Sequence, residues 1–227
     1  MSIHDNLIKV QDDIARTAIE AGRTPSHVKL LGVTKKQPID AIEEAYRAGL
    51  FDFGENYLQE AKPKVKALAH ADINWHFIGP LQSNKAKDIA RMFSWVHSVD
   101  RIKIASLLHA ERQDQQGPLN ICIQVNMDNE PSKSGVLVES LDELVEAILP
   151  LDSLRLRGLM AMPKIQKHAN LQIQSFDRLK NLLISINNRY NLNLDTLSMG
   201  TSQDYHSAIL SGSTIIRVGQ AIFGKRQ

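Results

Sequence analysis

The chain alternates short apolar runs with longer amphipathic segments, and this alternation constrains its fold more than any other feature. Strands that alternate with helices pair in parallel through right-handed crossovers. Eight strand–helix units in 227 residues predict one (β/α)8 barrel over residues 1–227, an α/β fold, with an open doubly wound sheet as the alternative. The predicted strands are residues 28–34, 51–56, 73–79, 95–99, 119–126, 154–161, 194–200 and 213–219.

One helix precedes this alternation. Leu7, Val10, Ile14 and Ala18 recur at helical spacing, and Gly22 ends the pattern, which predicts an extra N-terminal helix over residues 1–21. Another long helical pattern covers residues 169–190. No linker or low-complexity tract divides the chain, so a single domain is expected.

Composition excludes several classes of protein. A net charge of +2 does not favour a nucleic-acid or membrane surface. The first 22 residues lack the apolar region of a signal peptide, so they are not expected to be one, and no apolar stretch approaches the roughly 20 residues of a membrane span. The single cysteine, Cys122, lies in an apolar run, which favours a core side chain and a reducing compartment. A cytoplasmic protein is expected, and the sequence leaves monomer and weak dimer open.

In a barrel of this type the active site lies at the carboxyl ends of the strands. Lys35 and Lys36 follow the first predicted strand, and Asn56 follows the second. A partly desolvated lysine amine can condense with a carbonyl compound. Strand alternation alone does not decide whether Lys35 or Lys36 faces the interior.

The loops after the seventh and eighth strands often bind phosphate. Here they read MGTSQD and VGQ, with the hydroxyls of Thr201 and Ser202 and glycines that allow close backbone approach. A phosphate site beside a lysine suits a phosphorylated aldehyde, of which pyridoxal phosphate is the usual one. Arg217, in the last strand, could then meet the pyridine nitrogen.

Each of these features also has a plainer interpretation. A lysine at a strand end is usually solvated. Ser202 could be an ordinary helix N-cap, and Arg217 could simply pair with a carboxylate. His76 and His97 are typical of core histidines, and no cluster has metal-ligand spacing. Three alternate lysines are interpreted as an exposed helix face: Lys62, Lys64 and Lys66.

Several segments resemble the pyridoxal phosphate homeostasis proteins, single-domain relatives of the alanine racemase N-terminal barrel. The segments are GVTKKQP, FGENYLQEAKPK, WHFIGPLQSNK, VHSVDR, QVNMDNEPSKSG, LRLRGLMAMP, LSMGTSQDYHSAI and GSTIIRVGQAIFG. They cover nearly the whole chain in the order and spacing of that family.

The resemblance implies a pyridoxal phosphate site with specific residues. Lys35, rather than Lys36, would form the internal aldimine, and Arg217 would face the pyridine nitrogen. The cofactor ring and its surroundings would be lined by Asn56, His76 and Met160. The phosphate would be held by Ser198, Gly200, Ser202, Gly219 and Gln220. The family usually has threonine or a small residue where Gln220 stands. Lys133 and Ser134 match a further family signature.

The resemblance also implies a function. Such a protein stores, delivers or regulates pyridoxal phosphate, with dependent apoenzymes as recipients and without established catalysis. Alanine racemases carry a further β domain that supplies a catalytic tyrosine, and here Tyr57 and Tyr205 are candidates only by exclusion. Two alternatives stay open: a small amino-acid racemase, and a sugar-phosphate enzyme that uses Lys35 as its Schiff-base lysine.

Overall fold

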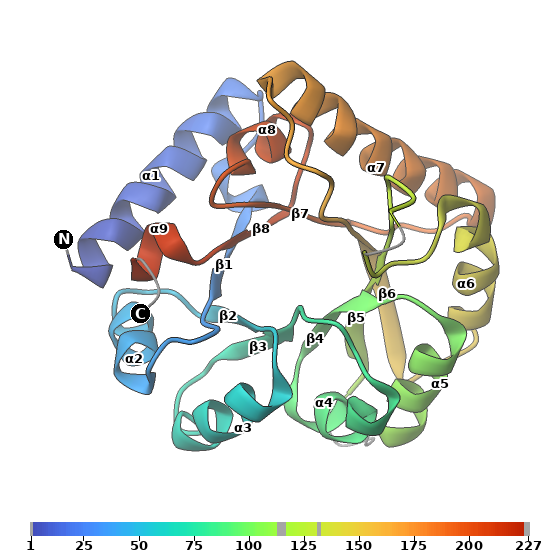
Figure 1. Cartoon of the computed structure of the whole chain (residues 1–227), viewed down its shortest axis with the longest axis horizontal. Helices are drawn as coiled ribbons and strands as arrows, with labels where there is room; N and C mark the ends of the chain where they lie inside the picture. Colours follow the sequence, from blue (N-terminus) through green and yellow to red (C-terminus); the bar gives the residue numbers. More distant parts are fainter. Residues whose placement is uncertain (1, 113–116, 131–132, 225–227) are drawn as a thin grey trace.

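Eight parallel strands form a closed barrel in chain order, β1 to β8 (Figure 1). The computed structural model describes residues 2–112, 117–130 and 133–224. The strands are β1 (Lys29–Val33), β2 (Asp52–Glu55), β3 (Asn74–Phe77), β4 (Trp95–Val99), β5 (Leu119–Gln124), β6 (Leu154–Met160), β7 (Thr196–Thr201) and β8 (Ile215–Val218). β1 pairs with β8 with Leu31 opposite Arg217, and this pairing closes the barrel. The predicted (β/α)8 fold is confirmed, and the open-sheet alternative is wrong.

Helices surround the barrel on its outer face (Figure 1). They are α1 (Ile3–Glu20), α2 (Ile39–Arg47), α3 (Leu58–Ala67), α4 (Ala86–Met92), α5 (Ile102–Glu111), α6 (Leu141–Ile148), α7 (Ala169–Tyr190), α8 (Tyr205–Leu210) and α9 (Gln220–Phe223), with single 3-10 turns η1 (Pro25–His27), η2 (Ser83–Lys85) and η4 (Val138–Ser140). None of the helices in the described ranges is long and apolar enough to cross a membrane.

The extra helix α1 packs against the first and the last helices of the barrel, α2 and α9. Its amide Asn6 Nδ2 donates to the Ile222 carbonyl of α9 at 3.0 Å, and the Ile3 amide donates to Glu44 Oε1 of α2 at 3.0 Å. In Figure 1, α1 lies outside α8 and α9. The helix therefore covers the seam where β1 meets β8.

The long helix α7 matches its sequence pattern from end to end. Phe176, Leu179, Leu183 and Ile186 recur at helical spacing and are all buried. Asn191 follows with φ of 52°, a left-handed conformation that commonly ends helices. The prediction of a helix over residues 169–190 is confirmed.

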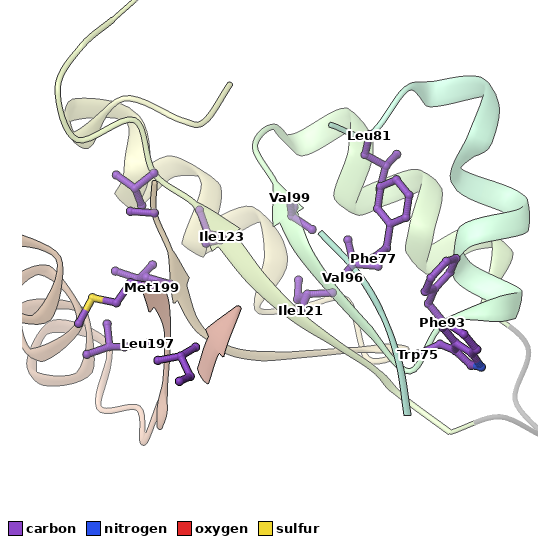
Figure 2. Close-up of a cluster of buried hydrophobic side chains, with 14 of the residues drawn as sticks. Trp75, Phe77, Leu81, Phe93, Val96, Val99, Ile121, Ile123, Leu197 and Met199 are labelled. Atoms are coloured by element: carbon purple, nitrogen blue, oxygen red, sulfur yellow. The ribbon is translucent and has the colours of Figure 1, made fainter. Parts of the chain in front are cut away.

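Alternation along each strand divides the apolar side chains into two sets. Outward side chains such as Phe77, Val96 and Ile121 pack with helix residues, and the Phe77 and Phe93 rings meet edge to face at 5.4 Å (Figure 2). Inward side chains form a smaller cluster: Leu31, Ile78, Trp95, Cys122, Met160 and Ile215, with Val33 packed against it. Polar groups occupy the remaining inward positions, and these connect to the candidate site.

Candidate cofactor site at the carboxy-terminal mouth

A cavity of about 280 Å³ opens at the carboxyl ends of β1, β2, β7 and β8. Its lining combines one lysine, one arginine, a serine and a glycine with apolar walls. The lining residues are Val33, Lys35, Asn56, Ile78, Met162, Thr201, Ser202, Gln203, Arg217, Gly219 and Gln220. The fold therefore brings together six of the residues predicted for the site: Lys35, Asn56, Ser202, Arg217, Gly219 and Gln220.

The two lysines after β1 differ in their surroundings. Lys35 continues the inward alternation of Leu31 and Val33, and it lines the cavity. Lys36 is exposed and has φ of 60°, the left-handed region, and its backbone amide donates to Glu60 Oε2 at 2.8 Å. The turn thus reverses the chain at Lys36, immediately after Lys35 has been placed toward the interior.

A buried ion pair supports this turn. Lys64 Nζ, on α3, donates to the Thr34 carbonyl and to Glu55 Oε1, both at 2.7 Å, and the Thr34 hydroxyl donates to the same oxygen at 2.6 Å. Burial raises the pKa of the Glu55 carboxyl, although the hydrogen bonds from Lys64 and Thr34 oppose that rise. The backbone immediately before Lys35 is therefore tied to both β2 and α3.

The position of Lys64 corrects one prediction. Lys64 is only 6% exposed, so the interpretation of Lys62, Lys64 and Lys66 as one exposed face is wrong for its central member. A sequence signal existed, since Leu58, Ala61 and Lys64 are spaced at three-residue intervals on the buried face of α3. A lysine reaches this face because Glu55, fully buried at the end of β2, provides the opposite charge.

The loops after β7 and β8 form the opposite wall. Gly200 has φ of +94°, and a Cβ there would lie 2.6 Å from the Cβ of Ala208, so the turn out of β7 requires glycine. The Gly219 amide donates to Ser202 Oγ at 3.4 Å, which joins the two loops. Ser202 is not the N-cap of α8. Asp204 precedes that helix and accepts from the amide and hydroxyl of Thr201 at 2.6 and 2.9 Å.

Arg217 is a buried cation, 4% exposed, that lines the cavity floor. Its guanidinium donates to Ser198 Oγ at 2.8 Å and to the Ala161 carbonyl at 3.2 Å. Burial lowers the pKa of Arg217 to about 10, so the side chain is charged at neutral pH. The plainer interpretation, a pairing with a carboxylate, does not match these two uncharged oxygen partners.

Four predicted site residues lie outside the cavity lining. His76, Met160 and Ser198 are fully buried in the barrel interior, and Gly200 is the residue just before the lining Thr201. The lining residues that sequence reasoning missed are Val33, Ile78, Met162 and Gln203. Inward alternation from Lys35 and from His76 was the signal that would have found Val33 and Ile78.

A second cavity of about 360 Å³ adjoins the first. The two share Asn56, Ile78 and Met162, and the second extends over the loop after β5, where Lys133 and Ser134 line it. Lys133 Nζ lies 3.2 Å from Glu130 Oε1 and 3.6 Å from Asp128 Oδ2. Asn56 Oδ1 is buried between the cavities and has no hydrogen-bond partner among the described residues, so a polar acceptor is available there.

The two tyrosines considered for acid–base chemistry do not line either cavity. The Tyr205 hydroxyl donates to Asp13 Oδ2 at 2.5 Å, between α8 and α1, and its burial together with this carboxylate raises the pKa of Tyr205. Tyr57 is half exposed just before α3. No tyrosine is found in the lining formed by the described residues.

The sequence matches known proteins over almost its full length. Residues 13–227 match the family described as the alanine racemase N-terminal domain. The pyridoxal phosphate homeostasis protein of Pseudomonas aeruginosa is 51% identical over 225 residues, which cover 99% of this chain and 96% of that relative. The chain belongs to the alanine racemase N-terminal domain family, among its pyridoxal phosphate homeostasis proteins. The homeostasis protein of Escherichia coli is 44% identical over 227 residues, covering 99% and 97%.

Solved structures of this family share the same barrel. PipY of Synechococcus elongatus, in a structure described as having PLP bound, superposes with a TM-score of 0.86 at 31% identity and covers 98% of this chain and 100% of its own. An alanine racemase from Corynebacterium glutamicum has a TM-score of 0.68 at 15% identity, and the match covers 59% of that chain. The racemase comparison shows a common fold only.

Proposed function

We propose that this chain binds pyridoxal 5'-phosphate covalently through Lys35 and acts in intracellular pyridoxal phosphate homeostasis, by storing, delivering or regulating the cofactor. The observation that carries the proposal is one cavity that contains Lys35, Arg217 and the joined loops after β7 and β8. The homeostasis proteins at 44–51% identity and the PLP-bound PipY structure support the same ligand.

The residues present fit this cofactor. Pyridoxal phosphate supplies an aldehyde that condenses with a lysine amine, and a ring whose electronics the protein tunes. Lys35 provides the amine, and its backbone is held by the Thr34 contacts. Ser202 and the Gly219–Gln220 backbone provide polar groups for the phosphate. Asn56 Oδ1 offers an acceptor to a polar group on the ring.

Arg217 supports binding without amino-acid turnover. A guanidinium beside the pyridine nitrogen lowers the pKa of that nitrogen, because two positive charges repel each other. An unprotonated ring is a weaker electron sink for a carbanion. The absence of tyrosine from the described cavity lining supports the same conclusion, since racemisation needs a second acid–base group. A racemase is the alternative activity, and it rests on the match to the alanine racemase N-terminal domain.

We extend the proposal to partners and location. A protein that holds the cofactor without using it would pass it to pyridoxal-phosphate-dependent apoenzymes. The buried thiol of Cys122 suits a reducing compartment such as the cytoplasm. His76, Met160, Ser198 and Gly200 were predicted to contact the cofactor ring or its phosphate; they lie outside the cavity lining, and we propose that they support the lining residues.

The test combines binding and turnover. Purified protein with added pyridoxal phosphate should develop a visible absorbance band that Lys36→Ala retains and Lys35→Ala loses. Exchange of the α-proton of alanine with deuterated solvent should not exceed that of free cofactor. A wild-type protein without the band would refute the binding proposal. Fast, stereospecific exchange would refute only the non-catalytic part and favour the racemase.

A further inference from the structure

A chain of hydrogen bonds crosses the barrel interior from one mouth to the other. Asp52 Oδ1, at the start of β2, lies 3.1 Å from His76 Nε2, and His76 Nδ1 lies 2.9 Å from His97 Nε2. His97 Nδ1 lies 2.7 Å from Ser198 Oγ, to which Arg217 donates at 2.8 Å. β4 and β7 are not neighbours in the barrel, so the bond from His97 to Ser198 spans the interior.

The interior keeps the two histidines neutral. Both are 0% exposed, and burial lowers the pKa of His76 and lowers that of His97 well below its usual value. The Asp52 carboxylate partly opposes the change at His76, whereas the charges on Arg217 and Lys29 add to it at His97. A neutral imidazole has one donor nitrogen and one acceptor nitrogen. Each ring therefore accepts a hydrogen bond from one neighbour and donates one to the other.

The Asp52 carboxylate fixes the direction of these hydrogen bonds, and the Arg217 end is compatible with that direction. Arg217 can only donate, so Ser198 Oγ accepts from it, and in this direction the hydroxyl gives its own proton to His97 Nδ1. His97 then carries its proton on Nε2 and donates to His76 Nδ1. His76 carries its proton on Nε2 and donates to Asp52, an ionised carboxylate that can only accept and that also accepts from Lys29 at 2.9 Å. The opposite direction would set an imidazole lone pair against that carboxylate.

The side chains that form these hydrogen bonds have little freedom to move. The His76 ring stacks on Trp95, with ring centroids 5.4 Å apart and planes 7° from parallel. The hydroxyl of Ser198 is the one side-chain acceptor that Arg217 contacts within the described residues. If the hydroxyl proton turned away from His97, its oxygen lone pairs would turn as well, and the guanidinium would lose its present direction.

We propose that this one-directional chain orients Arg217, so that Asp52, at the mouth opposite the cofactor cavity, is a positioning residue for the arginine of the cofactor site. This proposal rests on the proposed function only in its effect on cofactor binding. The assignment of the protons concerns the protein alone and holds whether or not a ligand is bound.

The experiment compares Asp52→Ala and Asp52→Asn with Asp195→Ala as the matched control. Asp195 also lies at the amino-terminal mouth and pairs with Arg157 at 2.6 Å, but no bond of the chain involves it. Nitrogen-15 spectra of the histidine rings report which ring nitrogen carries the proton, and an absorbance titration gives the Kd for pyridoxal phosphate.

The expected result is a graded one. In the wild type, His76 and His97 are both neutral with the proton on Nε2. Asp52→Ala changes the ring signals of both histidines and raises the Kd about tenfold, the scale of one hydrogen bond that serves a charged group. Asp52→Asn keeps an acceptor oxygen, keeps both tautomers and stays within about threefold of the wild-type Kd. Asp195→Ala changes neither readout.

Three results would overturn the proposal: a His97 proton on Nδ1 in the wild type, unchanged His97 signals in Asp52→Ala, or an unchanged Kd in that variant. If Asp52→Ala does not fold, His97→Asn interrupts the same chain and carries the same expectation for the Kd. Failure of the wild type to bind pyridoxal phosphate would refute the proposed function, while the histidine spectra would still test the chain.

Discussion

The cations at the two mouths of the barrel differ in the charge of their hydrogen-bond partners. At the amino-terminal mouth, Lys29 pairs with Asp52 at 2.9 Å and Arg157 pairs with Asp195 at 2.6 Å. At the carboxy-terminal mouth, the partners of Arg217 among the described residues are two uncharged oxygens, at 2.8 and 3.2 Å. A buried cation is costly unless an anion compensates it. The difference supports the proposal that the charge of Arg217 is kept for a ligand, whereas Lys29 and Arg157 at the other mouth already have carboxylate partners.

Lys64 is a cation at the carboxy-terminal mouth whose anionic partner is buried with it. Its pair with Glu55 is almost completely buried, in contrast to the half-exposed pairs at the opposite mouth. Removal of one partner from a buried pair leaves an uncompensated charge, which costs far more than the loss of a surface pair. The comparison of the mouths can therefore be tested by a series of changes with decreasing effects.

The largest effect is expected for Lys64→Met. The free energy of unfolding should fall by about 3 kcal/mol, because Glu55 would stay buried without its cation. Urea unfolding at pH 7 measures the loss. The control is Lys62→Met, which removes an exposed pair with Asp88 and should cost less than about 1 kcal/mol. Equal losses in the two variants would contradict the role of the buried pair, and Glu55→Gln combined with Lys64→Met should recover part of the stability.

Arg217→Met is expected to separate binding from stability. Affinity for pyridoxal phosphate should fall about thirtyfold, the size of one hydrogen bond to a charged group. The free energy of unfolding should stay the same or rise, because the substitution removes a desolvated charge that has no carboxylate partner in the part of the chain that the structure describes. An absorbance titration and urea unfolding measure the two quantities. Lost stability with unchanged affinity would show that Arg217 serves the fold, as the arginine at the other mouth does.

The histidines between the mouths should make stability depend on pH. Their folded pKa values lie below the usual 6.5, so below pH 6.5 the unfolded chain binds protons that folded His76 and His97 do not. As the pH is lowered, the free energy of unfolding should therefore decrease by up to about 1.4 kcal/mol per pH unit for each histidine. Urea unfolding between pH 7 and 5.5 measures the slope. His97→Asn should flatten it, and an unchanged slope would mean that His97 titrates in the folded protein.

The smallest effect is expected for Asp195→Asn at the amino-terminal mouth. This change weakens a partly exposed pair with Arg157, so the free energy of unfolding should change by less than about 1 kcal/mol and cofactor affinity should not change. Thermal unfolding and an absorbance titration check the two expectations. A large loss of affinity would show that this mouth influences the cavity by a route that does not involve the hydrogen-bond chain.

The barrel could be predicted from the sequence because each unit repeats the same local pattern. An apolar run that fits a strand and a periodic helix are both short-range signals, and they identified all eight strands and the full length of α7. The loops after β1, β7 and β8 could be placed together because the fold sets all carboxyl ends at one mouth. The choice between Lys35 and Lys36 needed either the family resemblance or the inward face of β1 in the structure.

The remaining features depend on contacts between distant elements. Burial of Lys64 requires Glu55 and the Thr34 carbonyl to meet α3, and lysine on a helix ordinarily lies in solvent. His76 and His97 were each expected to be buried, but their mutual contact depends on the register of β3 and β4. Ser198 was expected at the phosphate, and it lies one layer below the cavity, where it links His97 to Arg217. For the contact between the histidines and for the position of Ser198, no short-range pattern carries this information.

The most direct test of the account is to identify which lysine binds the cofactor. The wild-type protein is incubated with pyridoxal phosphate and reduced with borohydride, and the labelled peptide is sequenced by mass spectrometry. A single major label is expected on Lys35, because this lysine lines the cavity with Arg217, and no label above background is expected on Lys36, which is exposed beyond the turn. A major label on Lys36, or a labelling pattern unchanged in Lys35→Ala, would contradict it.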